Sequence, residues 1–243
     1  MAPAAAETMV SELRGLAGGV GLERHRTLAD RAFAALHDAI VMGQLAPGER
    51  LPIEELGEAL GMSAMPIREA LRRLDAAGLV ENIPHRGGRV TQLSIGDLGE
   101  VYEARLALEP LAIARAAARL NEEQAALAGE RLAVLDGLIE ENSPDTWAAH
   151  TAFHFALYEA GDSSWLLRLI RPLWETSQRY RLASAVAPKL GTRRAEHALI
   201  LRACADHDSE RAARLLYDHL ATTANDVSLA MGGTRLFEPR GAF

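Results

Sequence analysis

The spacing of apolar residues changes twice along the chain. Apolar positions recur at helical intervals from Thr27 to Gly43, within LPIEELGEALGM at 51–62, and again from Ser63 to Gly78. In LVENIPHRGGRVTQL at 79–93 the period shortens to that of strands, and PHRGG supplies a turn in which glycine is tolerated. The pattern therefore predicts three helices followed by a two-stranded hairpin.

After Ser94 the chain returns to the helical period and keeps it. Breaks at NSPD, GDSS, APKLG and DHDSE separate about six Ala-rich amphipathic stretches near 95–120, 122–141, 145–160, 164–186, 191–206 and 209–230. We expect a mainly α protein in which a winged helix-turn-helix precedes an all-α bundle of about six helices. The expected divisions are a flexible extension at 1–25, the winged unit at 26–92, the helical domain at 93–232 and a tail at 233–243.

The third predicted helix has two contrasting faces. Ile67, Ala70, Leu71 and Leu74 share one face, and Ala64, Met65, Arg68 and Arg72 lie opposite. A short helix, a glycine-containing turn and a second helix with outward arginines are typical of a helix-turn-helix, whose second helix enters the DNA major groove. Arginine suits this position because it binds phosphates and the acceptor edge of guanine. The alternative is an ordinary solvated helix face beside a surface loop.

Composition narrows the function classes. The 243 residues are 49% hydrophobic and 24% charged, which indicates a folded protein with room for two domains. A net charge of −7 argues against general coating of nucleic acid, although arginines gathered on one side still create a local basic surface. The single Cys204, the acidic N-terminal region and the lack of an apolar run of about 20 residues predict a cytoplasmic protein without a membrane span.

Four histidines form a candidate metal site. His150 and His154 are separated by one helical turn in HTAFH, so both imidazoles can reach one ion. His197 and His219 lie on two further predicted helices, and side chains on facing helices can converge inside a bundle. The alternative for each is a histidine with ordinary core or surface contacts. Imidazole ligands favour Zn or Ni among divalent metals.

Several segments together resemble a known family of bacterial regulators. GQLAPGERL, LGEALGMSAMPIREALRRLDAAGLVE and PHRGGRV are similar to the N-terminal winged helix-turn-helix of the GntR superfamily. LGEVYEARLALEPLAIARAAARL and the later histidine segments resemble the FCD ligand-binding domain of its FadR subfamily. The resemblance implies a homodimer that binds a pseudo-palindromic DNA operator, with a small organic acid as effector, and favours a repressor of metabolic genes.

The resemblance also assigns roles to individual residues. In the DNA-binding unit it matches Arg68, Arg72 and the wing tip, but Ala64 and Met65 replace the family's usual Arg and Thr. The complete set of expected DNA contacts is Ser63, Ala64, Met65, Arg68, Arg72, Arg73, His85, Arg86 and Gly87.

In the helical domain the family binds a divalent metal through one Asp and three His. His150 stands at the Asp position, and His154, His197 and His219 match the histidines. Arg105 matches the arginine of the family's E-x-R helix and is expected to bind the effector carboxylate through paired hydrogen bonds. Its alternative is a surface salt bridge with Glu109.

Two other functions compete with an effector-controlled regulator. A metal-responsive regulator would use the ion itself as the signal and need no organic effector. A metal-dependent hydrolase would use an open coordination position for water. The sequence contains neither G-x-S-x-G nor H-E-x-x-H, so we expect no enzymatic activity.

Overall fold

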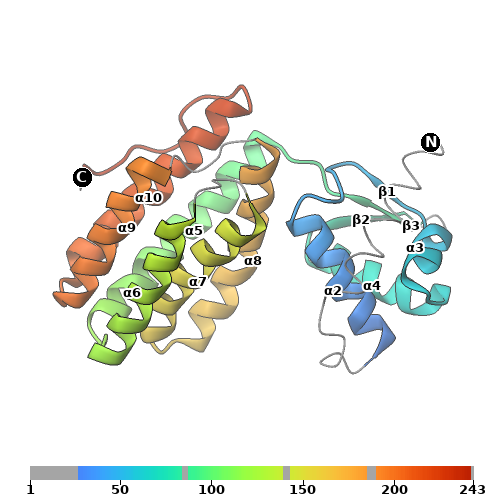
Figure 1. Ribbon diagram of the computed structural model, residues 1–243. Helices are drawn as coiled ribbons and strands as arrows, with labels where there is room; N and C mark the ends of the chain where they lie inside the picture. Colours follow the sequence, from blue (N-terminus) through green and yellow to red (C-terminus); the bar gives the residue numbers. More distant parts are fainter. Residues whose placement is uncertain (1–26, 84–86, 139–142, 185–189, 242–243) are drawn as a thin grey trace. The chain divides into compact units, whose positions relative to one another are not determined.

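The computed structural model describes residues 27–83, 87–138, 143–184 and 190–241. The sequence divides between Leu93 and Ser94 into two compact units, and each is described by itself (Figure 1). The first unit contains the helices α2 (Leu28–Val41), α3 (Ile53–Leu60) and α4 (Ala64–Ala76), and the strands β1 (Arg50–Leu51), β2 (Val80–Ile83) and β3 (Gly87–Val90).

Local signals define the ends of these helices. Thr27 begins α2 with a capping box, in which its hydroxyl accepts from the Asp30 N–H and the Asp30 carboxylate accepts from the Thr27 N–H. Gly61 ends α3 in the left-handed conformation, with φ of 63°. This turn lets α4 pack across α3, and Leu36, Leu56, Ile67 and Leu71 meet in the core.

The wing has one strand more than the sequence pattern predicts. The three strands pair in the order β1-β3-β2, with both pairs antiparallel and Val80 opposite Val90. Strand β1 has only two residues, which is too short to show an alternating pattern. Its position constrains Gly87, which has φ of 98° and would place a Cβ 2.1 Å from the carbonyl oxygen of Leu51. Only glycine fits at this crossing.

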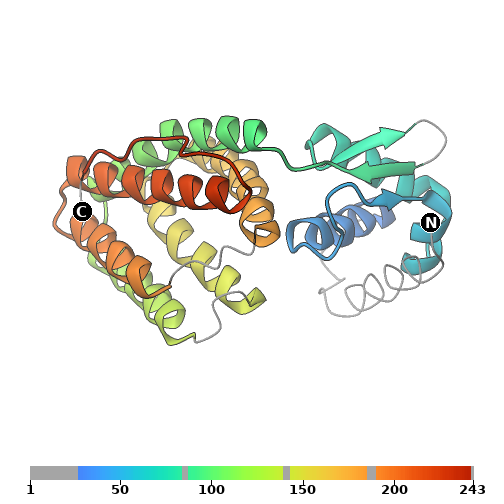
Figure 2. The same cartoon turned by 90° about the horizontal axis from the view of Figure 1, so that it is seen from above.

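The second unit is the predicted helical bundle. Its helices are α5 (Ile95–Ala117), α6 (Glu122–Gly137), α7 (Pro144–Ala160), α8 (Ser164–Ala183), α9 (Leu190–Ala205) and α10 (Ser209–Ala230). Helix α10 lies along α5, and α6 packs against α7 and α9 (Figure 2). Helix α5 also contacts α7, α8 and α9, which makes it the central helix of the bundle.

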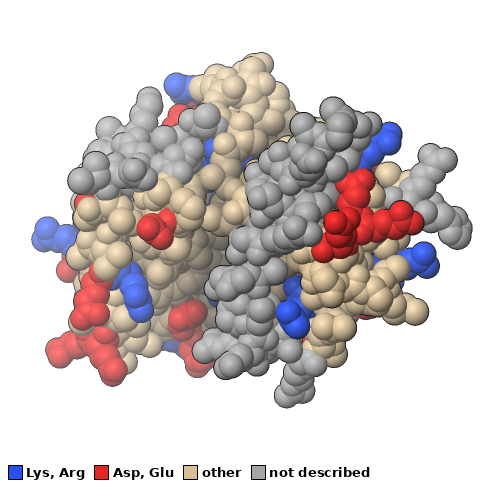
Figure 3. Space-filling view, turned by 45° about the vertical axis from the view of Figure 1, so that its right-hand side comes forward, with Lys and Arg blue, Asp and Glu red and all other residues tan. Residues whose placement is uncertain are grey.

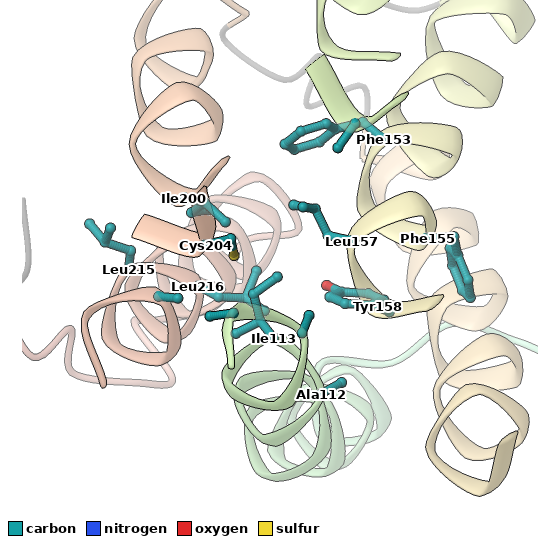
Figure 4. Close-up of a cluster of buried hydrophobic side chains, with 14 of the residues drawn as sticks. Ala112, Ile113, Phe153, Phe155, Leu157, Tyr158, Ile200, Cys204, Leu215 and Leu216 are labelled. Atoms are coloured by element: carbon teal, nitrogen blue, oxygen red, sulfur yellow. The ribbon is translucent and has the colours of Figure 1, made fainter. Parts of the chain in front are cut away.

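A single apolar cluster fills the bundle. Ile113 of α5, Leu157 of α7, Cys204 of α9 and Leu216 of α10 come together there (Figure 4). Cys204 is a small, fully buried residue of this cluster, and its burial raises the pKa of the thiol to about 12. None of the helices in the described residues is both long and apolar enough to cross a bilayer.

The segment after α10 folds back onto that helix. The Asn225 side chain accepts from the backbone N–H groups of Leu236 and Phe237 and donates to the carbonyl of Phe237. Asp218 accepts from the N–H of Arg240, whose guanidinium lies 3.8 Å from the centre of the Tyr217 ring. The predicted tail is therefore held along α10 as far as Arg240.

Candidate DNA interface and metal centre

Helix α4 presents the outward face that the sequence predicts. Ile67, Ala70, Leu71 and Leu74 are buried against the rest of the unit, whereas Ala64, Met65, Arg68 and Arg72 are exposed. The Met65 side chain is 76% exposed, which makes the start of this helix apolar at its surface. Ser63 occupies the N-cap position, but its side chain makes no capping hydrogen bond. The Ser63 hydroxyl is therefore not fixed by a capping bond to the start of α4.

The two arginines after Glu69 are held by different partners. Arg72 donates twice to the neighbouring Glu69 carboxylate, over 2.6 and 3.0 Å, and this hydrogen bonding lowers the pKa of Glu69. Arg73 donates to Asp30 of α2 over 2.8 Å and lies 4.2 Å from the centre of the Phe33 ring. Arg73 thus ties α4 to α2 and lies away from the face that carries Arg68.

The wing contributes less to the described surface. His85 and Arg86, both expected DNA contacts, lie outside the described residues. Gly87 is described, and its close approach to β1 gives it a structural role in addition to any DNA contact. On the face drawn in Figure 3, the described Lys and Arg side chains stand as separate groups among Asp and Glu. On α4 the exposed arginines are Arg68 and Arg72.

The bundle brings all four predicted histidines together. His150 and His154 come from α7, His197 from α9 and His219 from α10, and one ligand atom from each lies within 4.8 Å of the others. All four side chains are buried. The Nε2 atoms of His154 and His197 are 3.2 Å apart. Side chains from α7, α9 and α10 therefore create one nitrogen-lined site.

The chemistry of this cluster fits a divalent metal. Burial, followed by the charges of Arg181 and the other histidines, lowers the pKa of His150 well below its usual 6.5. His154 is shifted in the same direction, with burial again the main cause. Neutral imidazole is the form that binds metal. The Nδ1 atom of His150 is buried and has no hydrogen-bond partner within the described residues, as expected for a ligand set prepared for an ion.

Aromatic and cationic side chains border the cluster. Trp174 of α8 stacks on His150, with ring centres 5.3 Å apart, and Trp147 meets the same imidazole edge-on. The guanidinium of Arg181 lies 4.3 Å from the centre of the Trp147 ring and its charge acts on both His150 and His154. Arg181 therefore places a positive charge close to the neutral histidines of the cluster.

Arg105 is buried beside this pocket and already contacts a carboxylate. Its Nε and Nη2 donate to the two Glu109 oxygens over 2.5 and 3.2 Å, and its Nη1 donates to Ser177 over 2.8 Å. Burial alone would lower the pKa of Arg105, but the Glu109 carboxylate raises it above its usual value. The alternative pairing with Glu109 is present, yet both side chains lie in the interior and not at the surface.

Two polar residues behind the histidines were not predicted. Tyr158 donates to Glu109 over 2.6 Å and contacts the Nδ1 of His154 at 3.4 Å. Its burial, with Glu109 adding to the effect, raises the pKa of Tyr158 well above 10, so its hydroxyl keeps its proton. Glu196 contacts the Nδ1 of His219 at 2.7 Å. The i+4 spacing from His154 to Tyr158 was the one sequence signal for these contacts.

Comparisons with known families match both units. The model of the gntR family of bacterial regulatory proteins matches residues 28–90, and the FCD domain model matches 100–222. The chain belongs to the GntR family. Its FCD match includes Arg105 and the four clustered histidines. The resemblance seen in the sequence is confirmed, and the protein is a DNA-binding transcription regulator of this family rather than a member of an enzyme family.

Full-length relatives support the same assignment. An uncharacterized HTH-type transcriptional regulator, BphR of Paraburkholderia xenovorans, is 32% identical over 87% of this chain and 89% of its own. The HTH-type transcriptional repressor GlaR of Escherichia coli is 29% identical over 82% and 94%. The structure of E. coli McbR/YncC is 24% identical, covers 86% of this chain and 99% of its own, and has a TM-score of 0.73. This last likeness supports the fold.

Proposed function

We propose that a small carboxylate, bound at a metal-containing pocket in the FCD unit, controls the operator affinity of this GntR-family regulator. The observation that carries the proposal is the convergence of four buried histidine ligand atoms within 4.8 Å, in a unit separate from α4. His150, His154, His197 and His219 would hold a divalent ion, with Zn or Ni favoured by an all-imidazole ligand set. Once bound, the ion would supply a Lewis-acidic centre for an anionic ligand.

The charge of the pocket supports an acidic effector. Four neutral histidines would contribute no negative charge to the coordination sphere of the ion, and the charge of Arg181 acts on the same cluster. Arg105 remains the proposed second anchor for the effector carboxylate. Because Glu109 already occupies two of its donors, an incoming carboxylate must displace Glu109 or share the guanidinium with it. Effector binding would then rearrange contacts among α5, α7 and α8.

DNA contacts and assembly complete the proposal. Arg68 and Arg72 would contact bases or phosphates in the major groove, and Ser63, Ala64, Met65 and Gly87 would approach the DNA with Arg73 and the wing residues His85 and Arg86 alongside. One such helix reads few base pairs, so a homodimer on a pseudo-palindromic operator is expected. Leu111 of α5 and Trp165 and Leu169 of the neighbouring α8 are exposed apolar side chains, and we propose that they contact the second copy.

The name of one relative supports a direction of regulation. GlaR carries the name of a repressor, and we propose repression for this chain too, acting in the cytoplasm where operator DNA is reached. A ligand changes operator binding only through its different affinity for the two arrangements of the dimer, typically by about 1–3 kcal/mol. We therefore expect a small organic acid to weaken operator binding by about 5- to 150-fold.

The test is a DNA-binding titration over a panel of carboxylates and sugar acids. Metal content is measured first for the wild type and for His154→Ala. We expect stoichiometric metal and an effector response in the wild type, and neither in the variant, whose ligand-free DNA affinity stays close to that of the wild type. A metal-free wild type that still responds to an acid would overturn the proposed pocket. Light scattering at micromolar concentration tests the homodimer, which a monomer would contradict.

A metal-responsive regulator is the second candidate. Four histidines can complete a tetrahedral coordination sphere without any organic ligand, and this observation favours the ion as the signal. The two functions differ in one measurement. If the metal alone changes operator affinity and no acid adds to that change, the ion is the effector. If the acid acts only on the metal-loaded protein, the pocket binds an organic effector.

A further inference from the structure

The buried ion pair and the histidine cluster are joined by a continuous chain of polar contacts. Arg105 donates to Glu109, Glu109 accepts from the Tyr158 hydroxyl at 2.6 Å, and Tyr158 contacts the His154 Nδ1 at 3.4 Å. Arg105, Glu109, Tyr158 and His154 are all buried, so water does not substitute freely for any of these contacts. These contacts connect α5 to the side of α7 that carries His154.

The hydrogen bonds from Arg105 to His154 can have only one assignment of donors and acceptors. A guanidinium can only donate and a carboxylate can only accept, so Arg105 and Glu109 together leave Tyr158 as the donor to Glu109. A hydroxyl has one proton, and once that proton is given to Glu109 the Tyr158 oxygen can only accept from His154. His154 must then carry its proton on Nδ1. Its Nε2 then carries a lone pair and no proton, and in the metal-free protein this atom lies 3.2 Å from the His197 Nε2 and can only accept from it.

The tautomer of a second histidine in the cluster is fixed directly by a carboxylate. The Glu196 carboxylate lies 2.7 Å from the His219 Nδ1 and can only accept, which again leaves Nε2 as the ligand atom. In metal sites the non-ligating N–H of a histidine is commonly fixed by a carboxylate or another acceptor, and the loss of that partner typically weakens metal binding 10- to 100-fold.

We propose that Tyr158, fixed by the Glu109–Arg105 pair, is a positioning residue that sets the tautomer of His154 and presents its Nε2 to the metal. This inference rests on the proposed metal site and adds to it. It also gives Arg105 a function that needs no contact with the effector: the guanidinium orients Glu109, which in turn orients Tyr158 and His154.

The first experiment measures the tautomer in the metal-free, full-length wild type. Long-range ¹H–¹⁵N NMR of the imidazoles is expected to show His154 with its proton on Nδ1, and the Tyr158→Phe variant is expected to populate both tautomers. A wild-type His154 with its proton on Nε2 would overturn the inference. The measurement needs no metal, so it tests the tautomer of His154 separately from metal binding. The proposed metal function fails independently if the wild type binds no ion.

The second experiment measures affinity for Co²⁺ and Zn²⁺ by competition with a chelator. Tyr158→Phe is expected to bind each ion 10- to 100-fold more weakly and to shift the visible spectrum of bound Co²⁺. Tyr102→Phe is the matched control, because it removes a buried hydroxyl from α5 that has no hydrogen-bond partner within the described residues. Equal affinities in wild type, Tyr158→Phe and Tyr102→Phe would show that the hydroxyl of Tyr158 does not position His154.

Discussion

The two units each contain an arginine–glutamate pair within one helix, and the pairs differ in almost everything except their chemistry. On α4, Arg72 and Glu69 are 65% and 42% exposed. On α5, Arg105 and Glu109 are 2% and 0% exposed and are further bonded to Ser177 and Tyr158. The exposed pair can be exchanged for DNA contacts at little cost, whereas the buried pair can change partners only when the interior rearranges. In the function proposed above, the exposed pair would serve DNA binding and the buried pair would serve effector control.

The largest expected effect is a difference between the two arginine–glutamate pairs in how much each stabilises the folded protein. Glu109→Ala should lower the free energy of unfolding by about 3–5 kcal/mol, because it leaves the buried Arg105 charge without its partner. Glu69→Ala is the control and should change stability little, since Arg72 remains solvated. Urea unfolding of both variants measures the difference. The double change Arg105→Met with Glu109→Leu should recover much of the loss, and equal small losses for both single variants would contradict the comparison.

The second effect is the pH dependence of stability that the buried histidines of the helical bundle cause. Burial lowers the pKa of His150 and His154 below 6.5, so the folded protein keeps them neutral while the unfolded chain takes up protons. Their contribution is fully present above pH 6.5 and is lost as pH falls below it, by at most about 1.4 kcal/mol per pH unit for each histidine.

Urea unfolding of the metal-free protein at pH 7.5, 6.5 and 5.5 measures this slope. The His150→Asn variant serves as the matched comparison because it removes one titrating group from the cluster. Its stability should fall less steeply with acidification than that of the wild type. Parallel slopes in the two proteins would show that folding does not lower the pKa of His150.

The third effect concerns the exposed arginines of α4 and is measured as affinity for DNA. Arg68→Ala should weaken binding to the specific operator by at least tenfold if the side chain contacts a base, with less change on a scrambled duplex. Arg72→Ala should cost less, because Glu69 competes for its guanidinium in the free protein. Glu69→Gln should accordingly tighten DNA binding.

Fluorescence anisotropy at one fixed salt concentration compares these variants on the two duplexes. Arg131→Ala, which removes an exposed arginine from α6 of the other unit, is the control for net charge. An equal loss on operator and scrambled DNA for Arg68→Ala would identify a phosphate contact in place of base reading. No gain from Glu69→Gln would show that Arg72 does not need release from its pair.

The smallest effect distinguishes two helix starts within the first unit. Thr27→Ala should lower stability by about 1 kcal/mol, because it removes the capping box of α2. Ser63→Ala should leave stability nearly unchanged, because its hydroxyl makes no capping bond in α4, and should weaken DNA binding if the hydroxyl contacts a phosphate. Thermal unfolding and anisotropy measure the pair together. A loss of stability at Ser63 comparable to that at Thr27 would assign the hydroxyl a capping role.

Much of the architecture was predictable because it depends on local regularities. The helical period placed all the helices of the described bundle, and the exposed face of α4 followed from the spacing of Ile67, Ala70, Leu71 and Leu74. The i, i+4 spacing of His150 and His154 likewise predicted that both imidazoles lie on one helical face. Strand β1 was missed because two residues carry no period, and its pairing with β3 joins segments nearly forty residues apart.

The sequence alone determined which side chains could take part in binding, and the tertiary structure decided what they contact. Whether Arg105 bonds an effector or its own Glu109, and whether Tyr158 stands behind His154, depends on how α5, α7 and α8 pack. A hydrogen bond between side chains on different helices requires a separation of about 3 Å and a defined direction. Periodicity along one helix carries no information on that separation, so the partners of a buried polar group emerge only when the bundle closes around it.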